Sequence, residues 1–393
     1  MKIVLVHNSY QQPGGEDVVF DHECRLLENH GHQVIAYRRS NHEIEDLSVI
    51  ERATLVKRSI WAADTHREFS QLLARENPDV VHVHNTFLMI SPSIYGACRD
   101  RGVPVVQTLH NFRLLCPAAT FFRDGKVCEE CVDRGLLRSV RYGCYRDSRT
   151  ATASLAFMLA WHRHADTWNE MVDCYVALTE FARNKFIASG FPAHKIVVKP
   201  NFVDPDPGAR HHGGDYAIFV GRLSPEKGLN ILIDAWARLP EGHSLHIAGD
   251  GPERSRLERQ VCERNVAGVR FLGRLAHDDM IAAVQAARCL VLPSLWYEGF
   301  PMCIAEAFAC GTPVICSRLG GMQEIVDDGR TGLLFEPGDA ADLAAKIEWA
   351  WSHPSDLCVM GLEARREYEE RYAAEKNYTQ LMGIYEQAVA AYA

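Results

Sequence analysis

The stretch LVLPSLWYEGFPMCIAEAFACGTPVIC, residues 290–316, contains one complete strand–helix–strand unit. Its first apolar run, Leu290–Pro293, is typical of a strand that is buried on both faces. Pro301 opens a helix and Gly311 ends it, because proline suits the first helical turn and glycine suits the residue after the last. A second apolar strand follows at Val314–Cys316. Two buried strands joined by a helix are the repeating unit of parallel α/β sheets.

The same alternation runs along the whole chain, in two sets of strands. The first set is Ile3–Val6, Val34–Tyr37, Val80–Val83, Val103–Leu109, Cys174–Leu178 and Ile196–Lys199. The second set is Tyr216–Gly221, Leu245–Ala248, Val269–Leu272, Leu290–Pro293, Val314–Cys316 and Leu333–Phe335. Amphipathic helices lie between the strands, such as Gly15–His30, Leu229–Arg238 and Ala340–Trp351. This α/β pattern predicts two doubly wound parallel sheets, which bind ligands at the carboxyl ends of their strands.

A linker separates the two sets of strands. Asp204–Gly214 is rich in proline, glycine and histidine and has no apolar periodicity. We therefore predict a first Rossmann-like domain over residues 1–205 and a second over 206–375, with a central cleft between them that holds the ligand site. A helix over 376–393 follows and could return to the first domain.

The composition is that of a globular protein, since 47% of residues are hydrophobic and 24% are charged. With 42 basic and 51 acidic residues the net charge is −9, which argues against a nucleic-acid partner. The longest weakly polar stretch, 151–161, is much shorter than the ~20 residues that cross a membrane. Ile3–Val6 is too short for the apolar core of a signal peptide. We expect a cytoplasmic protein whose 13 cysteines are thiols or metal ligands.

The sharpest chemistry lies in the second domain. In YAIFVGRLSPEKG, residues 216–228, a buried strand ends before Arg222, and Ser224 and Pro225 are typical of a helix start. Lys227 would then lie in the first helical turn, where a cation opposes the helix dipole. A phosphate bound by Arg222, Lys227 and backbone amides removes that conflict. The alternative is a solvated lysine in an exposed loop.

A second candidate phosphate site follows the strand at residue 293. The loop Gly299–Met302, which includes Phe300 and Pro301, leads into a helix N-terminus. Glu306 is the one charged residue within Cys303–Cys310, and an ionised carboxylate in such a run needs a partner. The two hydroxyl groups of a sugar diol would supply one. Otherwise Glu306 faces solvent or pairs with an arginine.

These motifs occur together in one order, with Gly320-Gly321 and Glu324 beyond them. The segments concerned are Gly221-Arg222, Lys227-Gly228, Ile247-Ala-Gly-Asp-Gly-Pro252, Glu298, Glu306 and Gly320-Gly321. Over essentially the whole chain this order and spacing resemble the retaining family-four glycosyltransferases, also called glycosyl transferases group 1. The resemblance implies the GT-B fold, which is two Rossmann-like domains facing a cleft. It also implies transfer of a hexose from a UDP- or GDP-sugar to an acceptor hydroxyl, with retention and without a catalytic metal or other cofactor.

The resemblance also implies roles for single residues. In the family, the residues that match Arg222 and Lys227 neutralise the donor diphosphate. The residue matching Glu298 lies near the donor sugar, and the one matching Glu306 binds the nucleotide ribose. Fixed cations suit this chemistry, because departure of the nucleotide puts negative charge on phosphate oxygens.

The first domain supplies the acceptor side. Gly14 and Gly15, in the run Pro13–Asp17, allow a turn that brings backbone close to a diphosphate, as in the family's glycine-rich loop. The full G-x-G-x-x-G pattern is missing, which argues against NAD. The acidic Glu16-Asp17 departs from the commoner family wording. Its side chains either face the acceptor or complement the helix dipole.

His110 follows the strand Val103–Leu109, where ligand contacts belong. The resemblance implies that His110 lies close to the donor sugar and positions it, and we do not assign it as a general base. His84 is a weaker cleft candidate, and His82 is expected to be structural. Asn201 lies in a segment that resembles the family's interdomain Asn-Gly-Val-Asp motif and is expected to contact substrate or to serve as a hinge.

An insertion at residues 116–144 carries four cysteines in the pattern C-x11-C-x2-C-x12-C: Cys116, Cys128, Cys131 and Cys144. Four thiolates could close a structural, non-catalytic zinc site. Four free thiols fit the spacing equally well, and both interpretations stay open.

A basic stretch surrounds this insertion and precedes the apolar run Ala151–Trp161. Its cations are Arg134, Arg138, Arg141, Arg146 and Arg149. A basic segment beside an amphipathic one can touch anionic lipid, at the inner face of the membrane, or a lipid-diphosphate acceptor. We favour a solvated face and keep peripheral membrane contact as the second hypothesis.

The motifs predict a hexosyltransferase that takes a glycan or a lipid-linked acceptor, in glycan or cell-surface polysaccharide synthesis. Within the same fold the alternatives are a nucleotide-sugar epimerase and a glycan phosphorylase, and we find no lysine for a phosphorylase cofactor. Outside it, a non-catalytic module or lectin-like partner would bind UDP without turnover. The complete set Arg222, Lys227, Glu298 and Glu306 argues against such a module.

Overall fold

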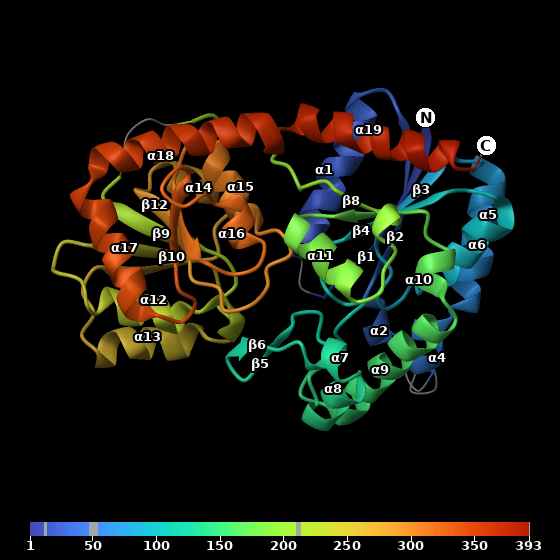
Figure 1. The fold of residues 1–393 in the computed structure, drawn as a ribbon, viewed down its shortest axis with the longest axis horizontal. Coiled ribbons are helices and arrows are strands. Elements are labelled where there is room, and N and C mark those ends of the chain that lie inside the picture. Colours follow the sequence, from blue (N-terminus) through green and yellow to red (C-terminus); the bar gives the residue numbers. More distant parts are fainter. Residues whose placement is uncertain (12–13, 47–53, 210–213, 393) are drawn as a thin grey trace. The chain divides into compact units, whose positions relative to one another are not determined.

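The computed structural model describes residues 1–11, 14–46, 54–209 and 214–392, and it contains two compact units (Figure 1). Unit 1 comprises Met1–Phe121, Glu129–Asn201 and Asn377–Ala393, and unit 2 comprises Phe122–Cys128 and Phe202–Lys376. Phe122–Cys128 therefore groups with unit 2, although we predicted it inside the first domain.

Unit 1 is built on a six-stranded parallel sheet in the order β2-β1-β3-β4-β7-β8. Its strands are β1 (Lys2–Ser9), β2 (Gln33–Ser40), β3 (Val80–Asn85), β4 (Val105–Leu109), β7 (Cys174–Ala177) and β8 (Ile196–Val198). All six residues of β3 and all five of β4 are buried, because helices cover both faces of the sheet. This is why each of these strands begins with a run of valines in the sequence.

The helices of unit 1 complete one hydrophobic core. They are α1 (Gly15–Asn29), α2 (Glu43–Asp46), α4 (Leu55–Ile60), α5 (Ala63–Glu76), α6 (Ser93–Arg101), α7 (Glu130–Asp133), α8 (Leu137–Tyr142), α9 (Arg149–His164), α10 (Thr167–Glu170), α11 (Glu180–Ala188) and the 3₁₀ turn η1 (Ala193–Lys195). From Asn377 onward α19 (Ala374–Ala390) belongs to this unit as well. Leu381 and Tyr385 of α19 pack in the same cluster as Leu5 and Phe20.

Unit 2 holds a second six-stranded parallel sheet, in the order β11-β10-β9-β12-β13-β14. Its strands are β9 (Tyr216–Val220), β10 (Ser244–Ala248), β11 (Val269–Gly273), β12 (Cys289–Leu292), β13 (Val314–Ser317) and β14 (Gly332–Phe335). Its helical elements are η2 (Pro225–Lys227), α12 (Leu229–Trp236), α13 (Arg254–Glu263), α14 (His277–Gln285), α15 (Met302–Ala309), α16 (Met322–Ile325), α17 (Ala340–Ser352), α18 (Pro354–Glu367) and the π-helical turn η3 (Tyr368–Tyr372). The short hairpin β5 (Phe122–Arg123) and β6 (Lys126–Val127) was not among the predicted strands.

The prediction of two doubly wound parallel sheets is confirmed, with a strand at each of the twelve predicted places. In each sheet the winding direction reverses at one point, which lies between β1 and β3 in unit 1 and between β9 and β12 in unit 2. Ligands bind beyond the carboxyl ends of strands at such points. Among the described residues, no helix is both long enough and apolar enough to cross a bilayer.

Candidate active site

The two loops at the reversal point of unit 2 are joined by a partly buried ion pair. Lys227 Nζ, in η2 after β9, lies 2.8 Å from Oε1 of Glu298, in the loop after β12. Ser294 Oγ donates a hydrogen bond of 2.6 Å to the same oxygen. Among the described residues no other side chain donates to this carboxylate, so Oε2 keeps its lone pairs for a ligand. The structure thus brings together two of the four residues predicted to be catalytic.

The pair keeps Lys227 charged. Burial acts to lower the pKa of Lys227, but the negative charge of Glu298 and the hydrogen bond to it outweigh burial, and the pKa is raised. The ammonium also lies 5.5 Å from the centre of the Trp296 ring. A fixed cation at this place suits a diphosphate.

Close backbone contact between loops explains the glycines of this region. A Cβ atom on Gly228 would lie 2.0 Å from the carbonyl oxygen of Pro293, and the φ angle of Gly228 is 69°. A Cβ atom on Gly249 would lie 1.8 Å from the carbonyl oxygen of Gly221. Any larger residue would push these loops apart, so the glycines set the distance between the ends of β9, β10 and β12.

The helix start that we predicted at Ser224 is wrong in detail. Lys227 belongs to a separate 3₁₀ turn, and α12 begins only at Leu229, because Gly228 adopts a left-handed conformation between them. The Ser224 hydroxyl does not cap a helix but donates to Glu226 Oε1 at 2.5 Å. Lys227 therefore lies in a single 3₁₀ turn that begins after Ser224, and not in the first turn of α12. Arg222 is solvent-exposed, as a residue that meets an incoming phosphate must be.

Glu306 is nearly buried, and within the part of the chain that the structure describes no side chain forms a hydrogen bond or ion pair with its carboxylate. It lies on α15, is 9% exposed, and burial raises its pKa to about 7. Neither alternative of the sequence analysis holds, since the residue does not face solvent and, among the described residues, no arginine contacts it. The negative charges of Glu306 and Glu298 and the positive charge of Lys227 all act on the Cys303 thiol. A ligand with hydroxyl donors would relieve the burial of the Glu306 carboxylate.

The remaining predicted residues of this loop have different roles. The Phe300 ring is buried and packs edge-on against Tyr372, with ring centres 5.6 Å apart. Its side chain is therefore structural, and only its backbone is available to a ligand. Gly299 is half-buried, and Pro301 is the buried N-cap residue of α15. Cys303 was missed by the sequence analysis because nothing distinguishes its thiol from other apolar positions of the helix.

In unit 1 the predicted His110 is the outer end of a chain of buried polar groups. His110 Nε2 lies 2.9 Å from His84 Nδ1, and His84 Nε2 lies 3.2 Å from Glu23 Oε2. Lys199 Nζ lies 3.8 Å from the other oxygen of Glu23. His84 is thus buried behind His110 instead of facing a ligand, as we had considered for it. Neither Glu23 nor Lys199 was singled out from the sequence.

The charges around these buried side chains favour one set of proton positions on His84 and His110. Burial acts to raise the pKa of Glu23, but Lys199 and the neighbouring histidines outweigh it and hold that pKa well below its usual range. Burial lowers the pKa of His84 and of His110, so both rings are neutral. An ionised Glu23 can only accept, so it favours the His84 tautomer that has its proton on Nε2, although the two groups, 3.2 Å apart, are not aligned as a hydrogen bond. His110 then donates from Nε2, and its Nδ1 is left as an acceptor.

Glu23, His82 and His84 are the one set of three in the described residues whose possible metal-ligating atoms lie within 4.8 Å of one another. Both nitrogens of His82 are already engaged, at 2.8 Å from Tyr385 Oη and 2.8 Å from Thr108 Oγ1. The Lys199 ammonium supplies the positive charge beside Glu23. The set is therefore a buried ion-pair network, and the structural role expected for His82 fits its contacts.

The start of α1 answers the question raised by Glu16 and Asp17. Asp17 accepts a hydrogen bond of 2.7 Å from the backbone N–H of Gly14, and its other carboxylate oxygen lies 2.9 Å from His7 Nε2. The Asp17 side chain therefore stabilises the N-terminus of α1. Glu16 accepts from an asparagine side chain, and burial, followed by the charge of Asp17, raises its pKa to about 8. Gly14 and Gly15 are exposed, whereas residue 13 lies outside the described residues.

Asn201 is buried, so its side chain is not available on a surface. The neighbouring residues are held by Asn377, which the sequence analysis missed. Asn377 accepts a hydrogen bond of 3.0 Å from Lys199 and donates one of 2.7 Å to the carbonyl of Pro200. A substrate contact for Asn201 stays a prediction.

The cysteines of the insertion are only partly gathered. A hydrogen bond from Cys131 lowers the pKa of Cys116 to about 6. The pKa of Cys131 is raised by that hydrogen bond and by burial, and to a smaller extent by the charge of Cys144. Cys128 belongs to unit 2, whereas the other three belong to unit 1. Among the residues that the structure describes, no three of these thiols bring their sulfur atoms within 4.8 Å of one another. The zinc site stays a prediction.

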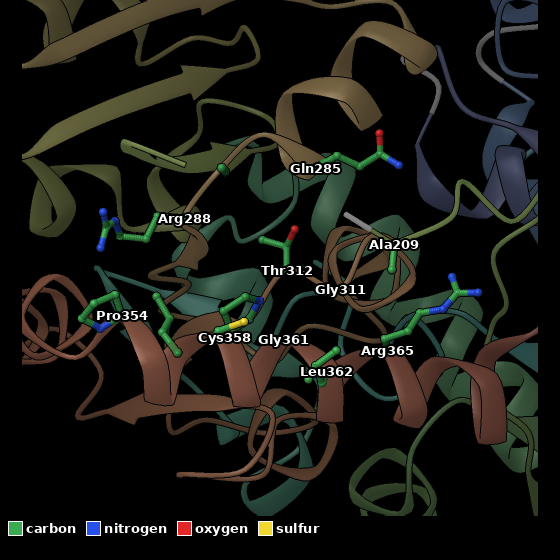
Figure 2. A pocket seen from close by; sticks show the side chains of 13 residues that line it. Ala209, Gln285, Arg288, Gly311, Thr312, Pro354, Cys358, Gly361, Leu362 and Arg365 are labelled. Atoms are coloured by element: carbon green, nitrogen blue, oxygen red, sulfur yellow. The ribbon is translucent and has the colours of Figure 1, made fainter. Parts of the chain in front are cut away.

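Unit 2 contains several further hollows, and two of them differ in how they lie to the predicted site residues. One, of about 170 Å³, is lined by residues such as Gln285, Thr312 and Arg365 and includes none of the predicted site residues (Figure 2). The other, of about 410 Å³, takes Pro225 from one site loop and Leu295 from the other. We place the candidate site beside this second hollow, because it is the one next to the Lys227 loop.

Comparisons with known proteins show the family of the chain. The model of the Glycosyltransferase Family 4 matches residues 13–207, and that of the Glycosyl transferases group 1 matches residues 204–374. An uncharacterized glycosyltransferase of Methanocaldococcus jannaschii is 34% identical over 45% of this chain and 50% of its own length. Glycogen synthase of Mycobacterium tuberculosis is 31% identical over 71% of this chain and 61% of its own length. The chain thus spans between half and two thirds of the length of these relatives.

Solved structures share the fold. The Anabaena protein Alr3699/HepE, solved with UDP and with UDP-glucose, has a TM-score of 0.72 in the UDP complex, at 20% identity, over 98% of this chain and all of that one. The two family models together match residues 13–374, and they agree with the two doubly wound sheets and with the order of the site loops. The chain therefore belongs to the family-four glycosyltransferases, group 1, with the GT-B fold.

Proposed function

We propose that this protein transfers a hexosyl group from a UDP- or GDP-sugar to an acceptor hydroxyl, with retention of configuration at the anomeric carbon. The observation that carries the proposal is the partly buried Lys227–Glu298 pair at the reversal point of unit 2. The unpartnered carboxylate of Glu306 supports it, because a ribose diol would give this group the donors that it lacks. The complexes of Alr3699/HepE with UDP and UDP-glucose support a donor of this class.

In the proposed reaction the bond between the anomeric carbon and the diphosphate oxygen breaks, and its electron pair stays on the diphosphate. The acceptor oxygen bonds to the anomeric carbon on the same face, and its proton passes to the departing diphosphate. Lys227 and Arg222 stabilise the charge that develops on the phosphate oxygens. Glu298 holds Lys227 in place and offers Oε2 to a sugar hydroxyl.

His110 is proposed as a positioning residue for the donor sugar. Burial holds its pKa well below the ordinary value, so it is a weak base, and its Nδ1 is left as an acceptor for a hydroxyl group. Nε2 of His110 donates a hydrogen bond to Nδ1 of His84, and this bond fixes the orientation of the His110 ring.

The test is a transfer assay on purified protein with UDP-glucose and GDP-mannose as donors and a panel of glycan and lipid-linked acceptors. Lys227→Ala is expected to lower kcat/KM by a factor of about 10² or more, since it removes one fixed cation. Lys376→Ala, an exposed lysine in the same unit, is the matched control and is expected to keep full activity. Full activity of Lys227→Ala would contradict the site.

The same assay separates the alternatives. An epimerase would convert the donor sugar without any acceptor, and a non-catalytic module would bind UDP in a thermal-shift measurement but form no product. We also propose that transfer needs no divalent cation, and undiminished turnover in EDTA is the result that this predicts.

A further inference from the structure

We propose that a face of unit 1 formed by α8 and α9 docks on the surface of an anionic lipid bilayer. We define this docking face by Leu137, Arg141 and Tyr142 on α8, and by Arg149, Phe157 and Trp161 on α9. The proposal is independent of the transfer reaction.

Large apolar side chains gather on this face in a way that a solvated surface does not need. Leu137 is 81% exposed, Phe157 is 54% exposed and Trp161 is 52% exposed. Six of the eleven exposed large hydrophobic side chains in the described part of the chain lie on α8, on α9, or on and directly after α4, which packs against α9. Two of the six are Val56, which lies on α4, and Trp61, which directly follows it. Figure 1 shows α4, α8 and α9 side by side. Contiguous exposed patches of this kind mark interaction sites.

The exposed groups of α9 form one stripe. The exposed residues of α9 are Arg149, Thr150, Ala153, Phe157, Ala160, Trp161, Arg163 and His164, and at 3.6 residues per turn these positions lie on one side of the helix. The Phe157 and Trp161 rings lie 6.4 Å apart. The opposite side of α9, with Leu155, Met158 and Leu159, is buried in a core cluster. The helix is therefore held flat on unit 1 by one apolar side and presents a second apolar side outward.

The charge of the segment selects the partner. Residues 134–164 contain six arginines and one aspartate, so this segment has a net charge of +5. The whole chain has a net charge of −9, so the remaining residues together carry −14. Among the described residues, none of these arginines forms a salt bridge with an acidic side chain. Unpaired arginines beside exposed Trp, Tyr and Phe are the composition of interfacial helices, in which aromatic rings enter the headgroup layer and cations meet anionic lipids.

A protein partner or a second copy of the chain fits less well. A second copy would bring like charge against like charge, since the face is self-similar in its arginines. A protein interface favours a few deeply seated anchors in a pocket, whereas none of these side chains lines one of the hollows found in the described residues. A membrane contact would also place unit 1, the acceptor side expected from the sequence, next to lipid-linked acceptors.

The experiment is co-sedimentation of the full chain with sucrose-loaded vesicles of phosphatidylcholine alone, or with about 30% phosphatidylglycerol, at low and high salt. The wild-type protein is expected to bind the anionic vesicles and to be released by about 500 mM NaCl, because the charges are screened. Removal of Arg141 and Arg149 together (Arg141→Ala/Arg149→Ala) is expected to weaken binding about 25-fold, since each basic residue contributes about fivefold. Phe157→Ser/Trp161→Ser is expected to weaken it about tenfold or more, and to abolish a blue shift of tryptophan fluorescence on binding.

Leu362→Ser is the matched control, because Leu362 is an exposed apolar residue on α18 in unit 2. This variant is expected to bind vesicles like the wild type. A thermal melt of each variant checks that it is folded, and UDP binding checks unit 2 separately. Two results would overturn the proposal: no binding to anionic vesicles, or equal binding by Phe157→Ser/Trp161→Ser. A concentration-dependent dimer in sedimentation velocity that this double variant dissolves would instead assign the face to a second copy.

Discussion

Glu306 provides the most direct test of the site, because its burial has a cost that can be worked out. The pKa of a carboxyl of this type is 4.5 when unperturbed, and burial raises that of Glu306 to about 7. At about 1.4 kcal/mol per pH unit, this difference corresponds to about 3 kcal/mol. Between these two pH values the folded chain keeps a proton on Glu306 that the unfolded chain has lost. The free energy of unfolding therefore falls as the pH rises from 4.5 to 7, and the whole cost is present above pH 7.

Glu306→Gln removes the charge and keeps the shape of the side chain. We expect the variant to equal the wild type in stability at about pH 5 and to exceed it by about 3 kcal/mol at about pH 8. Urea-induced unfolding of both proteins at the two pH values measures this difference. Glu263→Gln, at an exposed position of α13 in the same unit, is the control and should show no such pH dependence.

The same substitution should weaken the ligand. Ribose hydroxyl groups that donate to the carboxylate favour its ionised form, so UDP binding should lower the pKa of Glu306 and release a proton below pH 7. Titration calorimetry in buffers of different ionisation enthalpy measures that proton. The wild-type Kd should tighten as the pH rises towards 7, and the variant's Kd should be weaker and independent of pH. A stability gain that is equal at both pH values, or an unchanged Kd for UDP, would refute the reasoning.

Three further predictions concern other parts of the molecule. Glu23→Gln leaves the buried ammonium of Lys199 without its counter-charge and should cost about 3–5 kcal/mol in the free energy of unfolding, which Lys199→Met in the same chain should partly restore. Gly228→Ala places a Cβ atom 2.0 Å from a carbonyl oxygen at a φ angle of 69°, and a loss of about 3 kcal/mol together with weaker UDP binding is expected in thermal melts. Burial raises the pKa of Cys303 to about 12, so mass spectrometry after iodoacetamide treatment near pH 8 should find it modified roughly tenfold or more slowly than the exposed Cys262; equal rates would contradict its burial.

The strands were predictable because helices cover both faces of each sheet, so most positions of the central strands are apolar. The run Val80–Val83 shows this, since three of its four residues are valines and all four are buried. The loops that carry Lys227 and Glu298 were predictable for a related reason, since each follows such a strand and contains the glycine or proline that ends it. The hairpin at residues 122–127 was not, because two strands of two residues leave no periodic signal.

The network behind His110 could not be predicted from local sequence. Glu23 lies in an ordinary amphipathic helix pattern, where a glutamate normally faces water. Its burial depends on Lys199, which is far away in the sequence and reaches it only after the sheet has formed. The start of α12 was predicted wrongly for a similar reason, since the contact between Gly228 and the neighbouring loop decides where that helix begins.

The part of α19 that completes unit 1 has a consequence for synthesis of the chain. Asn377 bonds to Lys199, and Tyr385 bonds to His82, yet these residues leave the ribosome only after the main segment of unit 2 has been made. Until then Leu5 and Phe20 have no Leu381 to cover them, and the nascent first unit exposes part of its core. Unit 2 can complete its core as soon as its own strands emerge, so translation delivers a finished unit 2 before a finished unit 1. A premature stop codon before residue 377 would therefore damage the half of the protein that was translated first.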